Sequence, residues 1–140
     1  EGMSIDDAEN FLNKQSGIKG LSTYADMRDI RAAAEKGDAA SILALKVYIH
    51  RLLKYVGSYT AVLGGLDALT FTAGVGENDA DTRAELLDKL AAFGVKYDAA
   101  KNAERSKNPR IISTSDSSIS VMIIPTNEEL AIARFALELI

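Results

Sequence analysis

The spacing of apolar residues divides the chain into two halves. In residues 1–65, apolar side chains recur every three or four positions, which is the period of one face of an α-helix. This pattern predicts helices over residues 4–17, 26–37 and 38–65, of which the last is the longest. Residues 18–25 lack the period and are interrupted by a glycine, so we expect a loop there.

Within residues 38–65, the apolar and polar positions form opposite stripes. The apolar positions are Ile42, Leu45, Ile49, Leu52, Leu53, Val56 and Leu63. The polar stripe holds Lys46, His50 and Lys54, which are four residues apart and therefore share one helix face. His50 is the only histidine of the chain, and on this face we expect it to be solvated rather than catalytic.

The second half changes to short β-prone runs separated by turns. Residues 68–72 predict a strand that leads into the glycine-rich segment 74–78, after which Asn78 is expected to cap a helix. Residues 111–113 and 119–124 predict two further strands joined by a turn. The fold class is therefore α/β, helix-rich with a small sheet. Because three short strands can cover only part of the apolar helix surface, we expect the chain to be a fragment.

The last helix is expected to begin at a capping box, with Thr126 as the N-cap and Glu129 at the third helical position. Its buried face would consist of Leu130, Ala133, Leu137 and Ile140. Because the capping box uses Glu129, the neighbouring Glu128 is a spare carboxylate at the end of a strand. A carboxylate oxygen is a ligand that suits Mg²⁺, although the pattern alone favours a simple interaction with the helix dipole.

Composition and charge narrow the classes of function. A net charge of −4 leaves no basic surface for nucleic acid or an anionic membrane, but it does not exclude a nucleotide that carries its own Mg²⁺. The chain has no cysteine, which excludes disulfides and thiolate metal sites. Its apolar stretches are shorter than the ~20 residues of a membrane span, and its first residues do not resemble a signal peptide. We therefore expect a cytoplasmic location without a membrane or nucleic-acid partner.

Two segments are candidates for ligand binding, and each also has a purely structural explanation. Glycines in Gly74-Val75-Gly76-Glu77-Asn78 would let a ligand approach the backbone closely, yet the spacing alone favours a tight structural turn. It is neither a dinucleotide fingerprint nor a phosphate-binding P-loop, since Asp79 occupies the place of the third glycine and no Gly-Lys-Ser/Thr occurs. Asp26, before Met27 and Arg28, is explained as a helix cap without any ligand.

Five segments, taken in order, resemble the C-terminal stretch of the acetate kinase (acetokinase) family. They are Leu12–Gly17, Asp26–Asp29, Phe71–Asn78, Phe93–Val95 and Ile123–Arg134. The similarity spans essentially all 140 residues. It implies the actin-like (ribonuclease H-like) fold of that family. It also implies that residues 1–140 are the C-terminal nucleotide-binding portion of an acetate kinase whose upstream half is absent.

The resemblance assigns a role to each candidate residue. Asp26, Met27 and Arg28 match the triplet that contacts adenosine, Gly74, Val75, Gly76, Glu77 and Asn78 match the adenosine loop, and Glu128 matches the acid assigned to Mg²⁺. The catalytic residues of the family lie upstream, so none is expected in this chain. Two positions depart from the family pattern: Val75 stands where isoleucine is more usual, and Asp79, where serine often follows, adds a negative charge near the loop.

The implied reaction transfers the γ-phosphoryl group of ATP to acetate, giving acetyl phosphate and ADP. The resemblance also implies a homodimeric enzyme, and we expect this chain alone to be inactive. Two alternatives remain open. The carboxylic acid could be propionate or butyrate, because the pocket that distinguishes these kinases is not in the chain. The apolar stripe over residues 42–63 could instead belong to a helical dimerisation module without a ligand.

Overall fold

A computed structural model of the chain describes residues 2–139, which form two compact units. The first extends to Gly57 and the second begins at Ser58. No helix among the described residues combines the length and the apolar character that crossing a bilayer requires.

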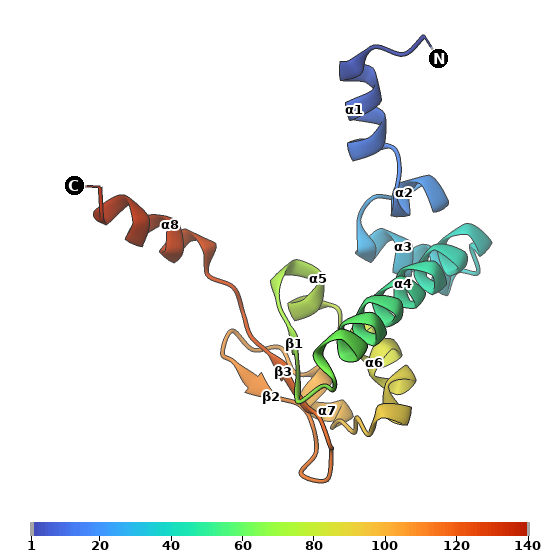
Figure 1. The fold of residues 1–140 in the computed structure, drawn as a ribbon. Coiled ribbons are helices and arrows are strands. Elements are labelled where there is room, and N and C mark those ends of the chain that lie inside the picture. Colours follow the sequence, from blue (N-terminus) through green and yellow to red (C-terminus); the bar gives the residue numbers. More distant parts are fainter. Residues whose placement is uncertain (1, 140) are drawn as a thin grey trace. The chain divides into compact units, whose positions relative to one another are not determined.

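The first unit contains α1 (Ile5–Lys14), α2 (Ile18–Leu21), α3 (Met27–Glu35) and most of α4 (Ala39–Leu63), as Figure 1 shows. Ser4 caps α1 by accepting a hydrogen bond from the Asp7 N–H at 3.1 Å, and at the start of α4 Asp38 accepts one from the Ser41 N–H at 2.8 Å. The expectation of a loop over residues 18–25 was wrong for α2. A helix of one turn is too short to display a helical period.

α4 confirms the predicted long helix but buries only part of its apolar stripe. Leu45 and Ile49 are buried, whereas Leu63 is 72% exposed. His50 is exposed, as expected from its place on the polar stripe. Gly64, at a φ of +73°, ends the helix in the left-handed region that favours glycine.

The second unit is built on a mixed sheet with the strand order β1 (Ala68–Phe71), β3 (Ser120–Ile123), β2 (Arg110–Ile111). β1 pairs with β3 in parallel, and β2 pairs with β3 in the antiparallel direction. The three predicted strands are thus confirmed. Alternate residues of the central strand, Val121 and Ile123, are fully buried. The remaining buried apolar side chains of this unit are Phe71, Leu86, Leu87, Leu90, Val95, Ile112 and Ile119.

Five helices complete the second unit. They are α5 (Ala73–Asn78), α6 (Ala80–Lys89), the 3₁₀ helix η1 (Ala91–Phe93), α7 (Ala99–Ala103) and α8 (Glu128–Leu137). The expectation that Asn78 caps a helix was wrong, because Asn78 is the last residue of α5. Asp79 is the cap of α6 instead, and its Oδ1 accepts from the Thr82 N–H at 2.9 Å. The helix α7 was not predicted, and Asp98 caps it.

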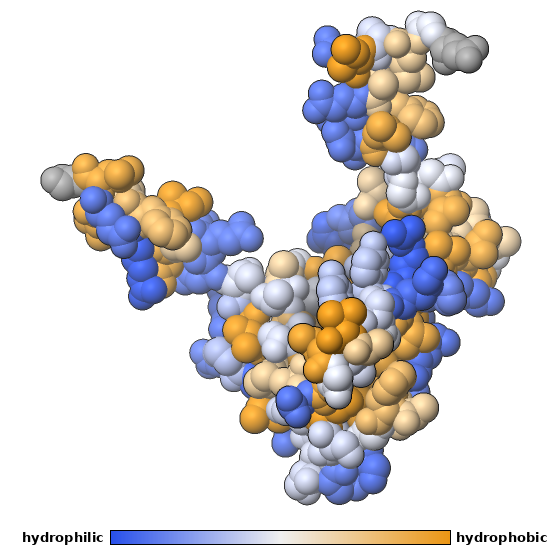
Figure 2. Space-filling view, viewed as in Figure 1, coloured by the Kyte–Doolittle hydropathy of each residue, from blue (hydrophilic) through white to orange (hydrophobic). Residues whose placement is uncertain are grey.

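The expectations for the last helix need two corrections. Asn127, not Thr126, is the N-cap of α8, and its side chain accepts from the Leu130 N–H at 3.0 Å. The predicted buried face is exposed, since Leu130 and Leu137 are 44% and 72% exposed and Ala133 is exposed as well. Ile140 lies outside the described residues. Figure 2 shows apolar side chains at the surface along α8. Periodicity predicts which face of a helix is apolar, but not what covers that face.

Gly94 offers a test of this packing. Its φ is +87°, and a Cβ there would lie 2.7 Å from the Ser118 Oγ. We expect Gly94→Ala to lower the free energy of unfolding by about 1–3 kcal/mol through backbone strain and steric overlap. Gly57→Ala, inside α4 with nothing within 4 Å of the added methyl, should instead raise it by up to about 1 kcal/mol. Urea denaturation measures both, and a Gly94→Ala chain as stable as the parent would contradict the prediction.

Candidate functional site

The parallel pairing of β1 and β3 brings two predicted site segments to one edge of the sheet. Phe71, the last residue of β1, lies opposite Ile123, the last residue of β3. Beyond this edge β1 continues into the glycine-rich helix α5, and β3 continues into the segment that carries Glu128. Ligands of α/β proteins bind outside the carboxyl ends of parallel strands, which is where these segments lie.

The chain leaving β3 is held by a defined series of backbone donors. The Ile124 N–H donates to the Phe71 carbonyl at 2.9 Å, which extends the pairing by one residue. Pro125 has no N–H to donate. The next donor, the Thr126 N–H, donates to the Glu77 Oε1 at 2.8 Å, and the Thr126 Oγ1 donates to the same oxygen at 3.1 Å. Glu77 of α5 is therefore tied directly to the segment that precedes Glu128.

Glycine occupies two positions of α5, and the structure explains each of them differently. A Cβ on Gly76 would lie 3.3 Å from the carbonyl carbon of Phe71, so close packing against the end of β1 explains this glycine. A Cβ on Gly74 would meet nothing within 4 Å, so its backbone is open to a ligand. Ala73, just before it, has a φ of +57°, which is uncommon for a residue other than glycine and costs of order 1 kcal/mol.

Arg83, which the sequence reasoning missed, supports α5 from the protein interior. Its side chain is 1% exposed. Its Nη1 donates to the carbonyl oxygens of Gly76 and Glu77, each at 2.9 Å. Its Nε donates to the Asn102 Oδ1 at 2.7 Å, and its Nη2 donates to the Asn102 carbonyl at 2.5 Å. Asn102 in turn donates to the Ala80 carbonyl at 2.9 Å, so one network joins α5, α6 and α7.

The electrostatics of Arg83 follow from its burial. Desolvation is the main cause that lowers its pKa, and the positive charge of Arg110 lowers it further. Its hydrogen-bond partners are carbonyl and amide oxygens, which satisfy the donors of a buried guanidinium. A signal was present in the sequence. Arg83 occupies the same helical face as the buried Leu86, Leu87 and Leu90, where a charged residue is unusual.

Asn78 and Asp79 close α5 by separate contacts. The Asn78 Nδ2 donates to the Gly74 carbonyl at 2.9 Å, which leaves the Asn78 Oδ1 as an acceptor on an exposed side chain. The negative charge of Asp79 was expected to act on the loop. Its effect on the loop stays a prediction. Its carboxylate accepts from the Thr82 N–H and from the Thr82 Oγ1, both at the start of α6. Val75 is half-buried between the two glycines.

Glu128 is the first residue of α8 and its side chain is exposed. Because Asn127 caps this helix, capping does not explain Glu128. The described residues contain no group of three or more His, Cys, Asp or Glu side chains that could hold a metal ion by themselves. A single carboxylate nevertheless fits Mg²⁺, which commonly binds proteins through one or two carboxylates and takes its other ligands from phosphates and water.

Asp26, Met27 and Arg28 belong to the first unit and open α3. The Asp26 Oδ1 accepts from the Arg28 N–H at 2.8 Å and from the Arg28 Nε at 3.0 Å, and the Oδ2 accepts from the Nη2 at 2.7 Å. Asp26 is therefore both a helix cap and one half of a two-pronged ion pair. This triplet belongs to the first unit and the segment Gly74–Asn78 to the second, and the adenosine contact expected of each stays a prediction.

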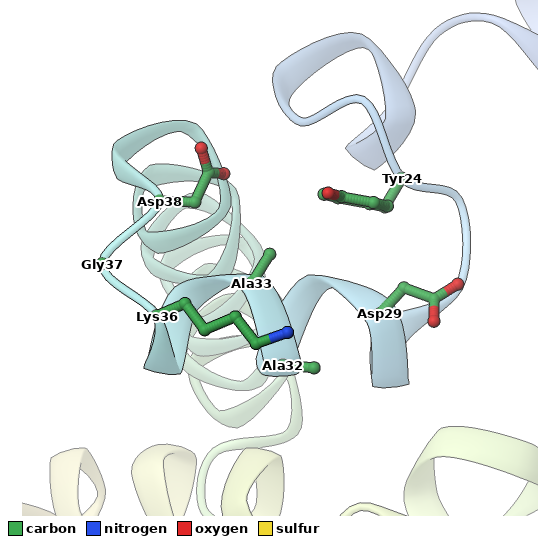
Figure 3. A pocket seen from close by; sticks show the side chains of 7 residues that line it. All are labelled: Tyr24, Asp29, Ala32, Ala33, Lys36, Gly37 and Asp38. Atoms are coloured by element: carbon green, nitrogen blue, oxygen red, sulfur yellow. The ribbon is translucent and has the colours of Figure 1, made fainter.

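The first unit also contains an open cavity of about 480 Å³. Figure 3 shows Tyr24 above the face of α3 that carries Ala33. The complete lining is Tyr24, Asp29, Ala32, Ala33, Lys36, Gly37 and Asp38. Asp26, Met27 and Arg28 do not line it, so the cavity and the predicted adenosine triplet are separate features of this unit.

The ion pair at the start of α3 predicts a pH dependence. Hydrogen bonds from the Arg28 side chain are the main cause that lowers the pKa of Asp26 from 3.8 to about 2. Since the folded pKa is lowered, the contribution of this carboxylate to stability is complete above pH 3.8 and is lost as the pH falls through about 2. In Arg28→Gln we expect the pKa of Asp26 to rise towards 3.8, measured by carboxyl NMR titration.

Asp116 provides the control for this titration, because the Lys96 and Thr114 side chains lower its pKa to about 2 independently of Arg28. Its midpoint should be the same in the parent and in Arg28→Gln. A midpoint for Asp26 near 3.8 in the parent chain would contradict the ion pair.

The sequence of the chain was compared with protein families and with curated proteins. The model described as "Acetokinase family" matches residues 1–134. The acetate kinase of Leifsonia xyli is 53% identical over 137 residues, which cover 98% of this chain and 34% of that protein. The chain thus spans about a third of the length of the curated relatives it matches.

Solved structures give the same result for the fold. The acetate kinase of Entamoeba histolytica has a TM-score of 0.89 at 32% identity, over 98% of this chain and 37% of that one. A propionate kinase from Francisella tularensis has a TM-score of 0.81 at 42% identity, over 94% and 33%. The predicted actin-like, helix-rich class with a small sheet is confirmed. The family match and these relatives together show that the chain belongs to the acetokinase family.

Proposed function

We propose that the chain is the C-terminal nucleotide-binding portion of an acetate kinase, which transfers the γ-phosphoryl group of ATP to acetate to give acetyl phosphate and ADP. Membership of the acetokinase family supports the reaction. The observation that carries the assignment to this chain is the parallel pairing of β1 and β3. It puts the open backbone of Gly74 and the carboxylate segment of Glu128 at one edge of the sheet.

We assign nucleoside binding to those groups of α5 that are not already used in the hydrogen bonds described above. The carbonyls of Gly76 and Glu77 already accept from Arg83, and the Gly74 carbonyl accepts from Asn78. The purine would therefore lie against the open side of Gly74 and Val75. The Asn78 Oδ1 would accept a hydrogen bond from the amino group of the base.

The triplet of the first unit would contribute a flat cation. Two hydrogen bonds to Asp26 fix the plane of the Arg28 guanidinium, whose side chain is 90% exposed. A guanidinium held in this way can stack on a purine face. Met27, half-buried in the first turn of α3, would add apolar contact. We propose that this surface contacts the adenosine of the nucleotide.

Glu128 would hold Mg²⁺, which would neutralise negative charge on the nucleotide phosphates during phosphoryl transfer. Phosphoryl transfer depends mainly on positioning and electrostatic stabilisation. The contribution of this chain would accordingly be to orient the nucleoside and the metal-bound phosphates. We assign it no catalytic acid, base or acetate-binding residue, and we expect the chain alone to be inactive.

A second candidate acceptor is propionate, because a propionate kinase of Francisella tularensis is among the solved structures that the chain resembles, with a TM-score of 0.81. Butyrate as the acceptor, the cytoplasmic location and the homodimer stay predictions, as does the alternative of a dimerisation module without a ligand. The exposed Val62 and Leu63 at the end of α4 are the feature that this last alternative would use.

A chimera tests the proposed reaction. The chain would replace the matched third of the Leifsonia xyli acetate kinase, and acetyl phosphate would be trapped as the hydroxamate. We expect turnover by the chimera and none by the 140 residues alone. Propionate and butyrate in place of acetate measure the acceptor preference of that chimera. Turnover by the isolated chain, or a folded chimera without activity, would refute the proposal.

Nucleotide contacts can be tested in the same chimera by calorimetry with Mg–ADP. Gly74→Val fills the open side of α5, and Arg28→Ala removes the flat cation. Each should weaken binding by about ten-fold or more, which corresponds to about 1.4 kcal/mol. His50→Ala, at an exposed position on α4, is the control and should bind as the parent does. Parental affinity in Gly74→Val would exclude α5 from the nucleotide site.

A further inference from the structure

We infer that Glu77 is a positioning residue: its carboxylate ties α5 to the segment that carries Glu128, so that the nucleoside-binding helix and the metal ligand are held in one arrangement. This inference deepens the proposed function and rests on it. The resemblance to the family places Glu77 in the adenosine loop, but its side chain is committed elsewhere in the molecule.

The contact between Glu77 and Thr126 joins residues that are 49 positions apart. One carboxylate oxygen, Oε1, accepts from both the N–H and the Oγ1 of Thr126. Hydrogen bonds to an ionised acceptor are about twice as strong as neutral ones. The Ile124 N–H makes the last backbone hydrogen bond to the end of β1, and Pro125 has no N–H. The contact between Thr126 and Glu77 is therefore the next attachment of this segment.

The main chain of Glu77 is held from the opposite side. Arg83 donates to the carbonyls of Gly76 and Glu77, and Asn102 fixes the Arg83 guanidinium. The backbone of Glu77 is thus attached to the interior, while its side chain extends to Thr126. If α5 moves, Glu77 and the Thr126 that it binds should therefore move with it.

Glu128 follows Thr126 by only two residues. Asn127, between them, caps α8 through the Leu130 N–H at 3.0 Å, which fixes where the helix begins. The position of the Glu128 carboxylate consequently depends on the position of Thr126. Glu77 should then act mainly on the Mg²⁺-dependent part of ADP affinity.

Two variants and one control test this role. Glu77→Ala removes the acceptor, Glu77→Gln keeps an uncharged oxygen acceptor, and Glu104→Ala removes an exposed carboxylate from the same unit. Amide exchange of Thr126, followed by NMR in the isolated chain, reports the contact itself. Calorimetry with ADP, with and without Mg²⁺, reports its consequence in the chimera.

We expect the Thr126 amide to exchange about ten-fold faster in Glu77→Ala, and the enhancement of ADP affinity by Mg²⁺ to fall by about ten-fold. Glu77→Gln should show smaller changes in the Thr126 exchange rate and in the Mg²⁺ enhancement than Glu77→Ala. Glu104→Ala should change neither quantity. Metal-free ADP affinity should fall by less than Mg–ADP affinity in Glu77→Ala.

Three results would overturn the inference. An unchanged Thr126 exchange rate would show that the contact is absent. Faster exchange with parental Mg²⁺ dependence would show that the contact is structural only. Equal weakening with and without Mg²⁺ would show that Glu77 contacts the nucleotide directly. Failure of the proposed function would give a different result. If Glu128→Ala kept the Mg²⁺ dependence of ADP binding, Glu128 would not be the metal ligand. Faster exchange of the Thr126 amide in Glu77→Ala would still show that the contact between Glu77 and Thr126 exists.

Discussion

The parallel register between β1 and β3 is the constraint on which the candidate site depends. Pairing of Ala68 with Ser120 through Phe71 with Ile123 makes both strands end at the same edge. A shift by one residue would turn the side chains of β3 to the opposite face and expose the buried Val121 and Ile123. Hydrophobic burial in the core therefore fixes the register, and the register fixes which segments emerge side by side.

Polar contacts then determine how those segments are arranged beyond the sheet. Among the described residues, neither α5 nor the segment after Pro125 contributes to the buried apolar core. Their positions rest on directional hydrogen bonds, from Arg83 to the end of α5 and from Thr126 to Glu77. Such a division suits a binding site, because the apolar core provides rigidity while the polar network leaves backbone and side-chain groups accessible to a ligand.

The sequence was sufficient where the determinants are local. The helical period predicted α1, α3 and α4. The caps of these helices at Ser4, Asp26 and Asp38 are local as well, because each accepts from an N–H within three residues. α2, α5 and α7 were missed, since four to six residues are too few to show a period.

The errors in the candidate site arose from contacts distant in sequence. Thr126 and Asn127 are both good caps. In the structure the Asn127 side chain accepts from the Leu130 N–H, while the Thr126 hydroxyl donates to Glu77, which is 49 residues away. Arg83 was missed for the same reason, because its buried partners lie on Asn102, 19 residues away. A single sequence predicts that a polar group needs a partner, but not which distant group supplies it.

Asp79 has a further consequence for how this region can vary. It is at once the residue that follows α5 and the cap of α6, so the two helices are joined without any connecting loop. One inserted residue would rotate the second helix by about 100° about its axis and carry the Arg83 guanidinium away from the carbonyls it binds. The interval of five positions between Asn78 and Arg83 is therefore a fixed length. This junction should tolerate changes of side chain far better than changes in the number of residues.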